Sequence, residues 1–530
     1  MHPADALRRW WAPAAAVLLA AIATARIAST YTVFNHTIDE PDTIAPGLEY
    51  LSIGKYLYED THPPLGRLFA AIGPYLSGER FHPGPESYLE GYRVLGHGAH
   101  YDRVLALARM GNLPFFWIAC AVVYLWAWRI RGPGAAVAAV LLYTTIPPVL
   151  AHAGLATTDM ALGAMTPAAA LAALWWADQP DRRRSLAFGA LAALACCSKF
   201  SALVFLPVGL AAIWATDRRP LKRAHGRALF WVLGMAALTV WAVYGFSFAR
   251  VEFLHLRLPA PRFFSGIHSV WMHNRGGHPA YLLGRRSANG FWYFFPTVLA
   301  LKTPLALLVL ALAAAAACFV QPLLNGRGSD RLASPDARSE PRPSGSRWTA
   351  APLAFSAAVL AVSMTGHIDL GVRYLLPVYT GLAVAAGCLA ASVRGVPARI
   401  AVSALLVWQI ASGARQHPDY LAYTNEIAGG HPEHFLADSD LDWGQDMKRL
   451  GDFLAARGVT RLTFSPFNRT YLWTGYPLPP LAAGVTDHPS PGWNAVSVTI
   501  WKVFGYPQWA DRAPPPDARI GRSILLWYVK

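Results

Sequence analysis

Ionisable side chains lie inside or directly beside apolar segments at several points of this sequence. They are Asp39, Glu40, His62, Asp159, Lys199, His367, Asp369 and Arg373. A carboxylate in such a place can remove a proton from a hydroxyl group, especially where partial burial raises its pKa. A neighbouring ammonium or guanidinium group can neutralise a phosphate. Together these residue types suit acid–base chemistry carried out beside an anion.

The acidic candidates each have a simpler interpretation. Asp39 and Glu40 follow the first apolar run by about eight residues and precede Pro41, so they fit an exposed acidic loop as well as a general base held near a membrane. Asp159, in LATTDMAL, fits the first turn of a helix that Thr157 or Thr158 caps. The alternative is that Asp159 orients an acceptor or holds a cation.

The basic candidates flank very apolar stretches. Lys199 lies in ACCSKFSALVFLP, and Arg373 lies in HIDLGVRYLLPVY. A lysine in this setting can extend its ammonium group to the membrane surface without any function. It can also bind an anionic headgroup such as a lipid phosphate, and Arg373 offers a second cation for the same purpose.

Several histidines in the outer segments are candidate metal ligands. His62 precedes two prolines, and further histidines follow at His152, His278 and His367. With the carboxylates they could hold a divalent metal ion, but no tight ligand spacing is present, so no cofactor is certain. The segment DSDLDWGQD lacks the glycine and glutamate spacing of a calcium loop. We interpret it as a turn before a helix.

Composition predicts a polytopic α-helical membrane protein. The chain has 530 residues, of which 54% are hydrophobic and only 15% are charged, whereas soluble domains carry about 25% charge. A run of roughly 20 apolar residues spans a bilayer as a helix. About eleven spans are expected, at 11–30, 111–130, 134–151, 159–177, 186–198, 201–216, 228–248, 291–319, 350–365, 374–392 and 398–414.

Arginine placement predicts the orientation. Every second connection between the spans is rich in arginine, and positive residues favour the cytoplasm. This places the N-terminus inside and the C-terminus outside the cell. The net charge of +15 then reflects topology, and no nucleic acid is expected as a partner.

The predicted organisation has two parts. Residues 1–414 form the transmembrane part, with a first outer loop at 31–110 and a disordered cytoplasmic linker at 321–347. In the outer loop, THPPLGRLFAAIGPYL reads as an amphipathic interfacial helix. Residues 415–530 lack a span, and RLTFSPF, AVSVTIWKVF and SILLWYV read as strands of a small α/β domain outside the membrane.

The order of these motifs resembles the GT-C superfamily of membrane glycosyltransferases. It is most similar to the branch of dolichyl-phosphate-mannose protein mannosyltransferases and aminoarabinose transferases. The resemblance rests on IDEPD, THPPLGRLFAAIGPYL, ATTDMALGA, CSKFSALVFLP, HPAYLLG with FWYFFPTVLALKTPL, and HIDLGVRYLLPVY. YLAYTNEIAGG and DSDLDWGQDMKRL resemble a bacterial subgroup, so the similarity covers most of the chain.

The resemblance implies an inverting, mannosyltransferase-like enzyme of protein glycosylation or the cell envelope. Such an enzyme moves a hexose or pentose from a polyprenyl-phosphate donor to a hydroxyl acceptor on the outer side of the membrane. It makes Asp39 the acid–base residue, paired with Glu40, and Asp159 the second acidic position. Lys199 would contact the lipid phosphate.

The remaining site candidates come from the same motifs. His62 stands in the HPPL stretch and Tyr374 follows Arg373, while His278 and His367 begin the later outer motifs. Neither the sugar nor the acceptor, whether protein, lipid or glycan, follows from these residues. A lipid-linked sugar flippase and a non-catalytic scaffold are the alternatives. Sparse polarity in mid-span disfavours the flippase, and the gathering of charges on one side disfavours the scaffold.

Overall fold

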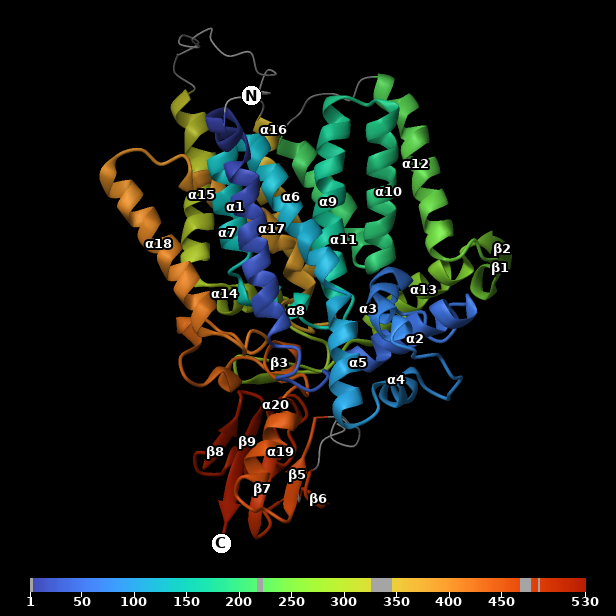
Figure 1. Ribbon diagram of the computed structural model, residues 1–530, viewed down its shortest axis with the longest axis vertical. Coiled ribbons are helices and arrows are strands. Elements are labelled where there is room, and N and C mark those ends of the chain that lie inside the picture. The colour runs from blue at the N-terminus through green and yellow to red at the C-terminus, as the bar shows by residue number, and fades with distance from the viewer. Residues whose placement is uncertain (1–2, 217–222, 326–345, 468–477, 485–486) are drawn as a thin grey trace.

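The computed structural model describes residues 3–216, 223–325, 346–467, 478–484 and 487–530. Figure 1 shows a bundle of long helices, a layer of short elements across one end of it, and a small sheet beyond that layer. Residues 326–345, most of the expected linker, lie outside the described residues. The ends of the predicted linker are helical, because the neighbouring helices run to Asn325 and start at Ser346.

Each predicted apolar segment coincides with a helix or with a bent pair of helices. The bundle contains α1 (Pro3–Ala28), α6 (Leu113–Arg131), α7 (Pro133–Tyr143), α8 (Pro147–Ala153), α9 (Asp159–Asp178), α10 (Arg182–Ser198), α11 (Ala202–Thr216), α12 (Arg223–Val243), α14 (Phe294–Lys302), α15 (Leu305–Asn325), α16 (Ser346–Ser363), α17 (Leu376–Ala390) and α18 (Val396–Arg415).

The chain is therefore a multi-pass membrane protein. Within the described residues, six helices are long and apolar enough to cross a bilayer, and up to eight spans result if each bent pair counts as one. The bends are 71° between α7 and α8 and 117° between α14 and α15. Both bends fall at prolines, Pro147 and Pro304, which remove a helical hydrogen bond.

Small residues allow the central helices to approach closely. Helix α17 contacts α6, α7, α9, α15 and α16, and α9 is buried along nearly its whole length. Both helices are rich in alanine and glycine. Lipid tails give no hydrophobic reason for apolar helices to associate, so close backbone packing at small residues supplies much of the attraction.

The layer of short elements contains several of the ionisable residues singled out above, among them Asp39, Glu40 and Arg373. It consists of α2 (Asp39–Ile53), α3 (Pro64–Leu76), α4 (Ser87–Leu95), α5 (Gly98–Met110), β1 (Phe248–Val251), η1 (Glu252–Leu254), β2 (Leu256–Pro259), α13 (Pro261–Gly276), β3 (Ala280–Leu282), β4 (Arg285–Ser287) and η2 (Val372–Leu375). Helix α3 starts at Pro64, as the sequence predicted for THPPLGRLFAAIGPYL.

The C-terminal region contains a five-stranded mixed sheet. Its elements are η3 (Glu426–Ala428), η4 (Pro432–His434), η5 (Asp438–Asp440), α19 (Met447–Ala455), β5 (Leu462–Ser465), β6 (Leu481–Ala483), β7 (Gly492–Ser497), α20 (Val498–Lys502), η7 (Gln508–Asp511), β8 (Ala518–Ile520) and β9 (Ile524–Val529). The strand order is β6-β5-β7-β9-β8, with β6 and β7 parallel to β5 and the other pairs antiparallel.

Only the first part of one predicted strand is a β-strand in the structure. The stretch AVSVTIWKVF leaves the sheet after Ser497 and continues as α20. The backbone N–H of Thr499 donates to the buried carboxylate of Asp442 at 2.8 Å. A buried carboxylate strongly favours such donors, so this hydrogen bond fixes the point at which the strand ends.

Gly47 lets α2 lie directly against α3. A Cβ atom at this position would collide with the carbonyl oxygen of Arg67. We predict that Gly47→Ala lowers the free energy of unfolding by about 1–3 kcal/mol, the usual cost of overpacking. Gly134→Ala, with nothing within 4 Å of the new methyl group, is the control and leaves the melting temperature unchanged or raised. Equal melting temperatures for the two variants would contradict the close contact.

Candidate active site

Asp39 and Arg373 meet although 334 positions separate them in the chain. Asp39 is the first residue of α2, and its side chain is 31% exposed. Arg373, in η2, donates from Nη1 to Oδ2 of Asp39 at 2.6 Å. The carboxylate of Asp39 is therefore partly exposed, whereas the guanidinium group that binds it is buried.

Asp159 and Lys199 continue this arrangement inward. Asp159 begins α9 and is 1% exposed, and it accepts a hydrogen bond from Nζ of Lys199 at 2.5 Å. Its other oxygen lies 3.9 Å from Nη1 of Arg373. Acids and bases thus alternate in the order Asp39, Arg373, Asp159 and Lys199, which we call the charge chain.

Asp159 lies in the first turn of α9, as expected, but the simpler interpretation of Lys199 does not fit the structure. Lys199 does not extend toward the membrane surface, because its side chain is 7% exposed and points at Asp159. Thr158 precedes α9, but its side chain makes no capping hydrogen bond. Each carboxylate instead has a cation of this chain as its partner, which offsets the cost of placing it beside the bilayer.

Aromatic rings surround the two cations. Nζ of Lys199 lies 4.2 Å from the centre of the Tyr374 ring. The guanidinium carbon of Arg373 lies 5.8 Å from the same ring and 4.5 Å from the ring of Trp443. Cations are attracted to ring faces, most strongly where water is excluded. Tyr374 thus contacts the charge chain through both cations.

His152 is the nearest histidine to the charge chain. It is 1% exposed, its Nδ1 lies 4.0 Å from Asp159, and its ring packs edge-on to Trp443. Nδ1 has no hydrogen-bond partner within the described part of the chain. Sequence reasoning identified His152 only as one of several outer histidines.

Glu40 faces away from the charge chain. Its fully buried carboxylate accepts from Nε and Nη2 of Arg109 at 2.8 and 2.9 Å and from the backbone N–H groups of Thr37 and Ala156. Burial alone would raise the pKa of Glu40, but the charge and hydrogen bonds of Arg109, together with the two backbone N–H donors, outweigh it and hold the pKa below its usual value. The expected pairing of Glu40 with Asp39 in catalysis therefore lacks geometric support.

His62 belongs to a different cluster. Its Nδ1 lies 3.8 Å from Glu59 and 3.4 Å from the guanidinium group of Arg67. Among the described residues, Asp42, Glu59 and His62 are the one group with the spacing of metal ligands. Arg67 already bridges Asp42 at 2.9 Å and also contacts Glu59, so its guanidinium group supplies the positive charge that a metal ion would bring.

His278 and His367 lie together on the outer loops. The backbone N–H of His278 donates to the carbonyl oxygen of His367 at 3.1 Å, and the His278 ring stacks on His273. Nearby, the Asp369 carboxylate accepts from the backbone N–H of Phe291, and burial raises its pKa to about 6. These contacts shape the loop, and neither histidine ring has a described contact with the charge chain.

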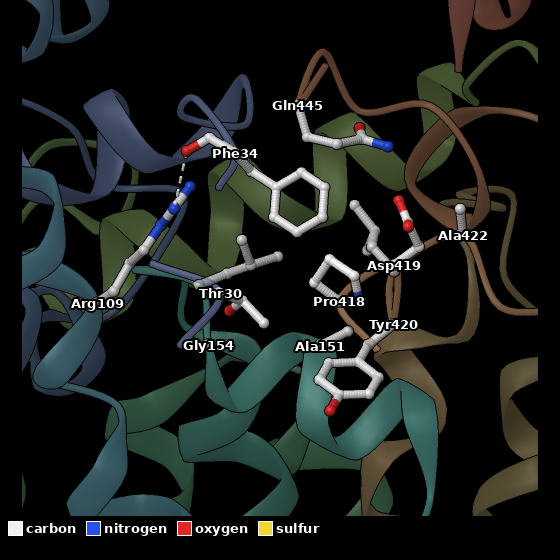
Figure 2. Close-up of a pocket in the computed structure, with 12 residues that line it drawn as sticks. Thr30, Phe34, Arg109, Ala151, Gly154, Pro418, Asp419, Tyr420, Ala422 and Gln445 are labelled. Carbon is white, nitrogen blue, oxygen red and sulfur yellow. Dashed lines mark hydrogen bonds between the residues drawn. The ribbon is translucent and has the colours of Figure 1, made fainter. Parts of the chain in front are cut away.

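A small cavity lies behind the loop that leads to Asp39. Thr30, Phe34, Arg109, Tyr420 and Gln445 are among its lining residues, and Figure 2 shows Arg109 donating to the carbonyl oxygen of Phe34. Its volume of about 30 Å³ holds one or two water molecules. It is too small for a polyprenyl phosphate, so the charge chain and not this cavity is the candidate active site.

A comparison with protein families matches the first part of the chain. Residues 16–258 match the family described as dolichyl-phosphate-mannose-protein mannosyltransferase. This segment is less than half of the chain, and it contains Asp39, Asp159 and Lys199 but not Arg373. The match and the fold support the GT-C superfamily of membrane glycosyltransferases, in its branch of dolichyl-phosphate-mannose and aminoarabinose transferases.

Solved structures share the GT-C fold at low sequence identity. ArnT from Cupriavidus metallidurans bound to undecaprenyl phosphate is 14% identical, with 96% of this chain and 97% of that chain covered and a TM-score of 0.50. The apo oligosaccharyltransferase of Archaeoglobus fulgidus is 12% identical, with 93% and 70% covered and a TM-score of 0.50. No curated protein matches the chain significantly.

Sequence reasoning missed the partners that hold the site. Arg109 and Arg67 are each 1% exposed and bind Glu40 and Asp42. An arginine just before an apolar segment, as in LARMGNLP, is a usable signal. The sequence around Trp443 contains no such signal, because Trp443 lies in the C-terminal region, many residues away along the chain from Asp39 and Arg373.

The GT-C site should depend on the buried pair of Glu40 and Arg109 for stability. We predict that Arg109→Met lowers the free energy of unfolding by about 3–5 kcal/mol, because it leaves a buried carboxylate without a cation. Adding Glu40→Gln should recover much of the loss. Thermal unfolding in detergent measures both effects.

Arg103→Met is the matched control, because Arg103 is exposed on the same helix α5. It should leave the melting temperature unchanged. An equally small effect of Arg109→Met would show that the pair does not hold α2 in place.

Proposed function

We propose that this protein transfers a sugar, with inversion, from a polyprenyl-phosphate donor to a hydroxyl acceptor on the outer side of a membrane. The observation that carries the proposal is the charge chain of Asp39, Arg373, Asp159 and Lys199. It combines a half-exposed carboxylate with two cations at the end of a membrane bundle. Those are the groups that a displacement at a sugar phosphate needs.

The pairing within the charge chain indicates how the donor enters. Its two cations are already paired with its two carboxylates, so an added phosphate must take a cation from one of them. Asp159 is buried and lies close to both cations, whereas Asp39 is partly exposed and pairs only with Arg373 among the described cations. The phosphate therefore takes the place of Asp39 on Arg373, while Lys199 stays paired with Asp159 behind it.

The displaced carboxylate is then the base. Asp39 accepts the proton of the acceptor hydroxyl, and the hydroxyl oxygen forms a bond to the anomeric carbon from the face opposite the phosphate. The bond between that carbon and the phosphate oxygen breaks, and its electron pair stays on the polyprenyl phosphate. Arg373 and Lys199 stabilise the charge that grows on the leaving phosphate. Glu40 and Arg109 hold the start of α2, and thus Asp39, in position.

The membrane arrangement belongs to the proposal. Eleven spans, an N-terminus inside the cell and a C-terminal region 415–530 outside it place the charge chain at the outer face of a bacterial inner membrane. The arginine-rich connections support this orientation. Helices α10, α11 and α16 complete the count of eleven, although α10 starts with three arginines and the other two are short.

Asp39→Asn tests the base. We predict that it lowers transfer from a polyprenyl-phosphate sugar by at least about 100-fold, the usual contribution of a general base. Binding of undecaprenyl phosphate should stay equal or become tighter, because the variant frees Arg373. Product mass after incubation with a panel of polyprenyl-phosphate sugars measures transfer, and thermal stabilisation by undecaprenyl phosphate measures binding.

Asp60→Asn is the matched control for this test. Asp60 lies in the same first outer loop and pairs with Arg262 at 3.8 Å, away from the charge chain. It should leave both transfer and binding unchanged. Full transfer by Asp39→Asn would exclude Asp39 as the base, and weaker binding of undecaprenyl phosphate would exclude the exchange of Arg373. Lipid-linked sugar that crosses vesicle membranes without any transfer product would favour a flippase.

The orientation has its own test. A reporter that is active only in the periplasm should be active when fused after Lys530 and inactive when inserted within 326–345. A cytoplasmic reporter should give the reverse pattern, because the two positions lie on opposite sides of the membrane. Periplasmic activity at 326–345 would place the charge chain on the cytoplasmic side and overturn the proposal.

A further inference from the structure

The segment 438–446 of the C-terminal region, DSDLDWGQD, reaches the charge chain. Trp443 is 2% exposed, and its ring covers the guanidinium group of Arg373 at 4.5 Å. The same ring packs edge-on to His152 and forms an apolar cluster with Ile38 and Leu155. A residue of the C-terminal region is therefore part of the wall of the active site.

The same segment also binds residues 35–38, which lead into Asp39. The carbonyl oxygen of Trp443 accepts from the backbone N–H of Ile38 at 3.1 Å. The side chain of Asn35 donates to the carbonyl oxygen of Gly444 and accepts from the backbone N–H of Met447, each at 2.7 Å. The position of Asp39 thus follows the position of this segment.

It also binds the loop that leads into Arg373. The backbone N–H of Val372 donates to Asp440 at 2.8 Å, and the Ser439 hydroxyl donates to the carbonyl oxygen of Leu370 at 2.7 Å. Gly371 has a φ of +85°, and a side chain there would meet Ser439 and Asp440. The two loops that carry Asp39 and Arg373 are therefore both fastened to one short segment.

The C-terminal sheet holds the segment itself. Asp442 is 1% exposed and accepts from the hydroxyl of Ser497 and from the backbone N–H of Thr499. The Thr499 hydroxyl donates to the carbonyl oxygen of Asp442 at 2.7 Å. Asp440 and Asp442 thus face different partners and do not form a calcium loop.

We propose that Trp443 is a positioning residue for Arg373, and that the C-terminal region acts in catalysis by completing the active site through it. The Trp443 ring is the nearer of the two rings that lie against the guanidinium group, which donates from Nε to the carbonyl oxygen of Leu370 at 2.9 Å. This leaves Nη1 directed at Asp39. When a phosphate replaces Asp39, the ring keeps the guanidinium group in the same plane. The inference rests on the proposed function for its role in transfer.

A double-mutant cycle between Trp443 and Arg373 tests the inference. Trp443→Leu should weaken undecaprenyl phosphate binding and lower kcat/KM for transfer about tenfold, the value of a buried cation–π contact. In an Arg373→Gln background, the same change should cost less than about twofold, because contacting residues are not additive. Trp443→Phe keeps a ring face and should recover most of the loss.

Two further measurements test whether Trp443 positions Arg373 or only stabilises the C-terminal region. Trp493→Leu removes a partly buried tryptophan of strand β7 that packs on Phe453 and Tyr528. It should lower the melting temperature without lowering kcat/KM. The melting temperature of the detergent-solubilised protein gives the same Trp443–Arg373 cycle without any substrate, and it should also be non-additive.

The outcomes are distinct. Losses that add in both cycles, or a Trp493→Leu variant as impaired in transfer as Trp443→Leu, would overturn the positioning role. Wild-type protein without transfer or undecaprenyl phosphate binding would overturn the proposed function instead. In that case the cycle in melting temperature alone decides whether Trp443 holds Arg373.

Discussion

The ion pair between Arg373 and Asp39 is the contact on which the rest of the site depends. A charge beside a bilayer costs several kcal/mol unless a partner or water offsets it. Here two cations and two carboxylates alternate, and each segment that supplies one comes from a different part of the chain. Removing Arg373 leaves Asp39 without a cation, and removing Asp159 leaves Lys199 without a carboxylate. The neutral chain therefore stabilises the contacts between helices α2, α9, α10 and the turn η2.

The same contact links stability to chemistry. The buried members of the charge chain, Asp159 and Lys199, are fixed by each other, while Asp39 is held by one cation and is exposed to incoming substrate. An anion can compete for that cation without breaking the buried pair. The site can thus stay folded when empty and still release a carboxylate when a phosphate enters.

Much of this fold was accessible from the sequence. Apolar length located every segment of the bundle, because a helix that crosses a bilayer needs a run of about 20 apolar residues. The bends between α7 and α8 and between α14 and α15 were missed, because hydropathy does not change across them. In the site, Asp39, Asp159, Lys199 and Arg373 were found because charge beside apolar sequence is rare. Sequence reasoning assigned Asp39 and Glu40 to the same site. In the helix their side chains point in different directions, as adjacent helical residues do, so only Asp39 joins the charge chain. Trp443 was missed because only the folded chain brings the C-terminal region to Arg373.

A structure of the protein with bound undecaprenyl phosphate tests the central claim most directly. Our account predicts the phosphate on Arg373 in the place of Asp39, with the guanidinium group still against Trp443 and the pair of Asp159 and Lys199 intact. A phosphate bound elsewhere, with the contact between Arg373 and Asp39 intact, would contradict it.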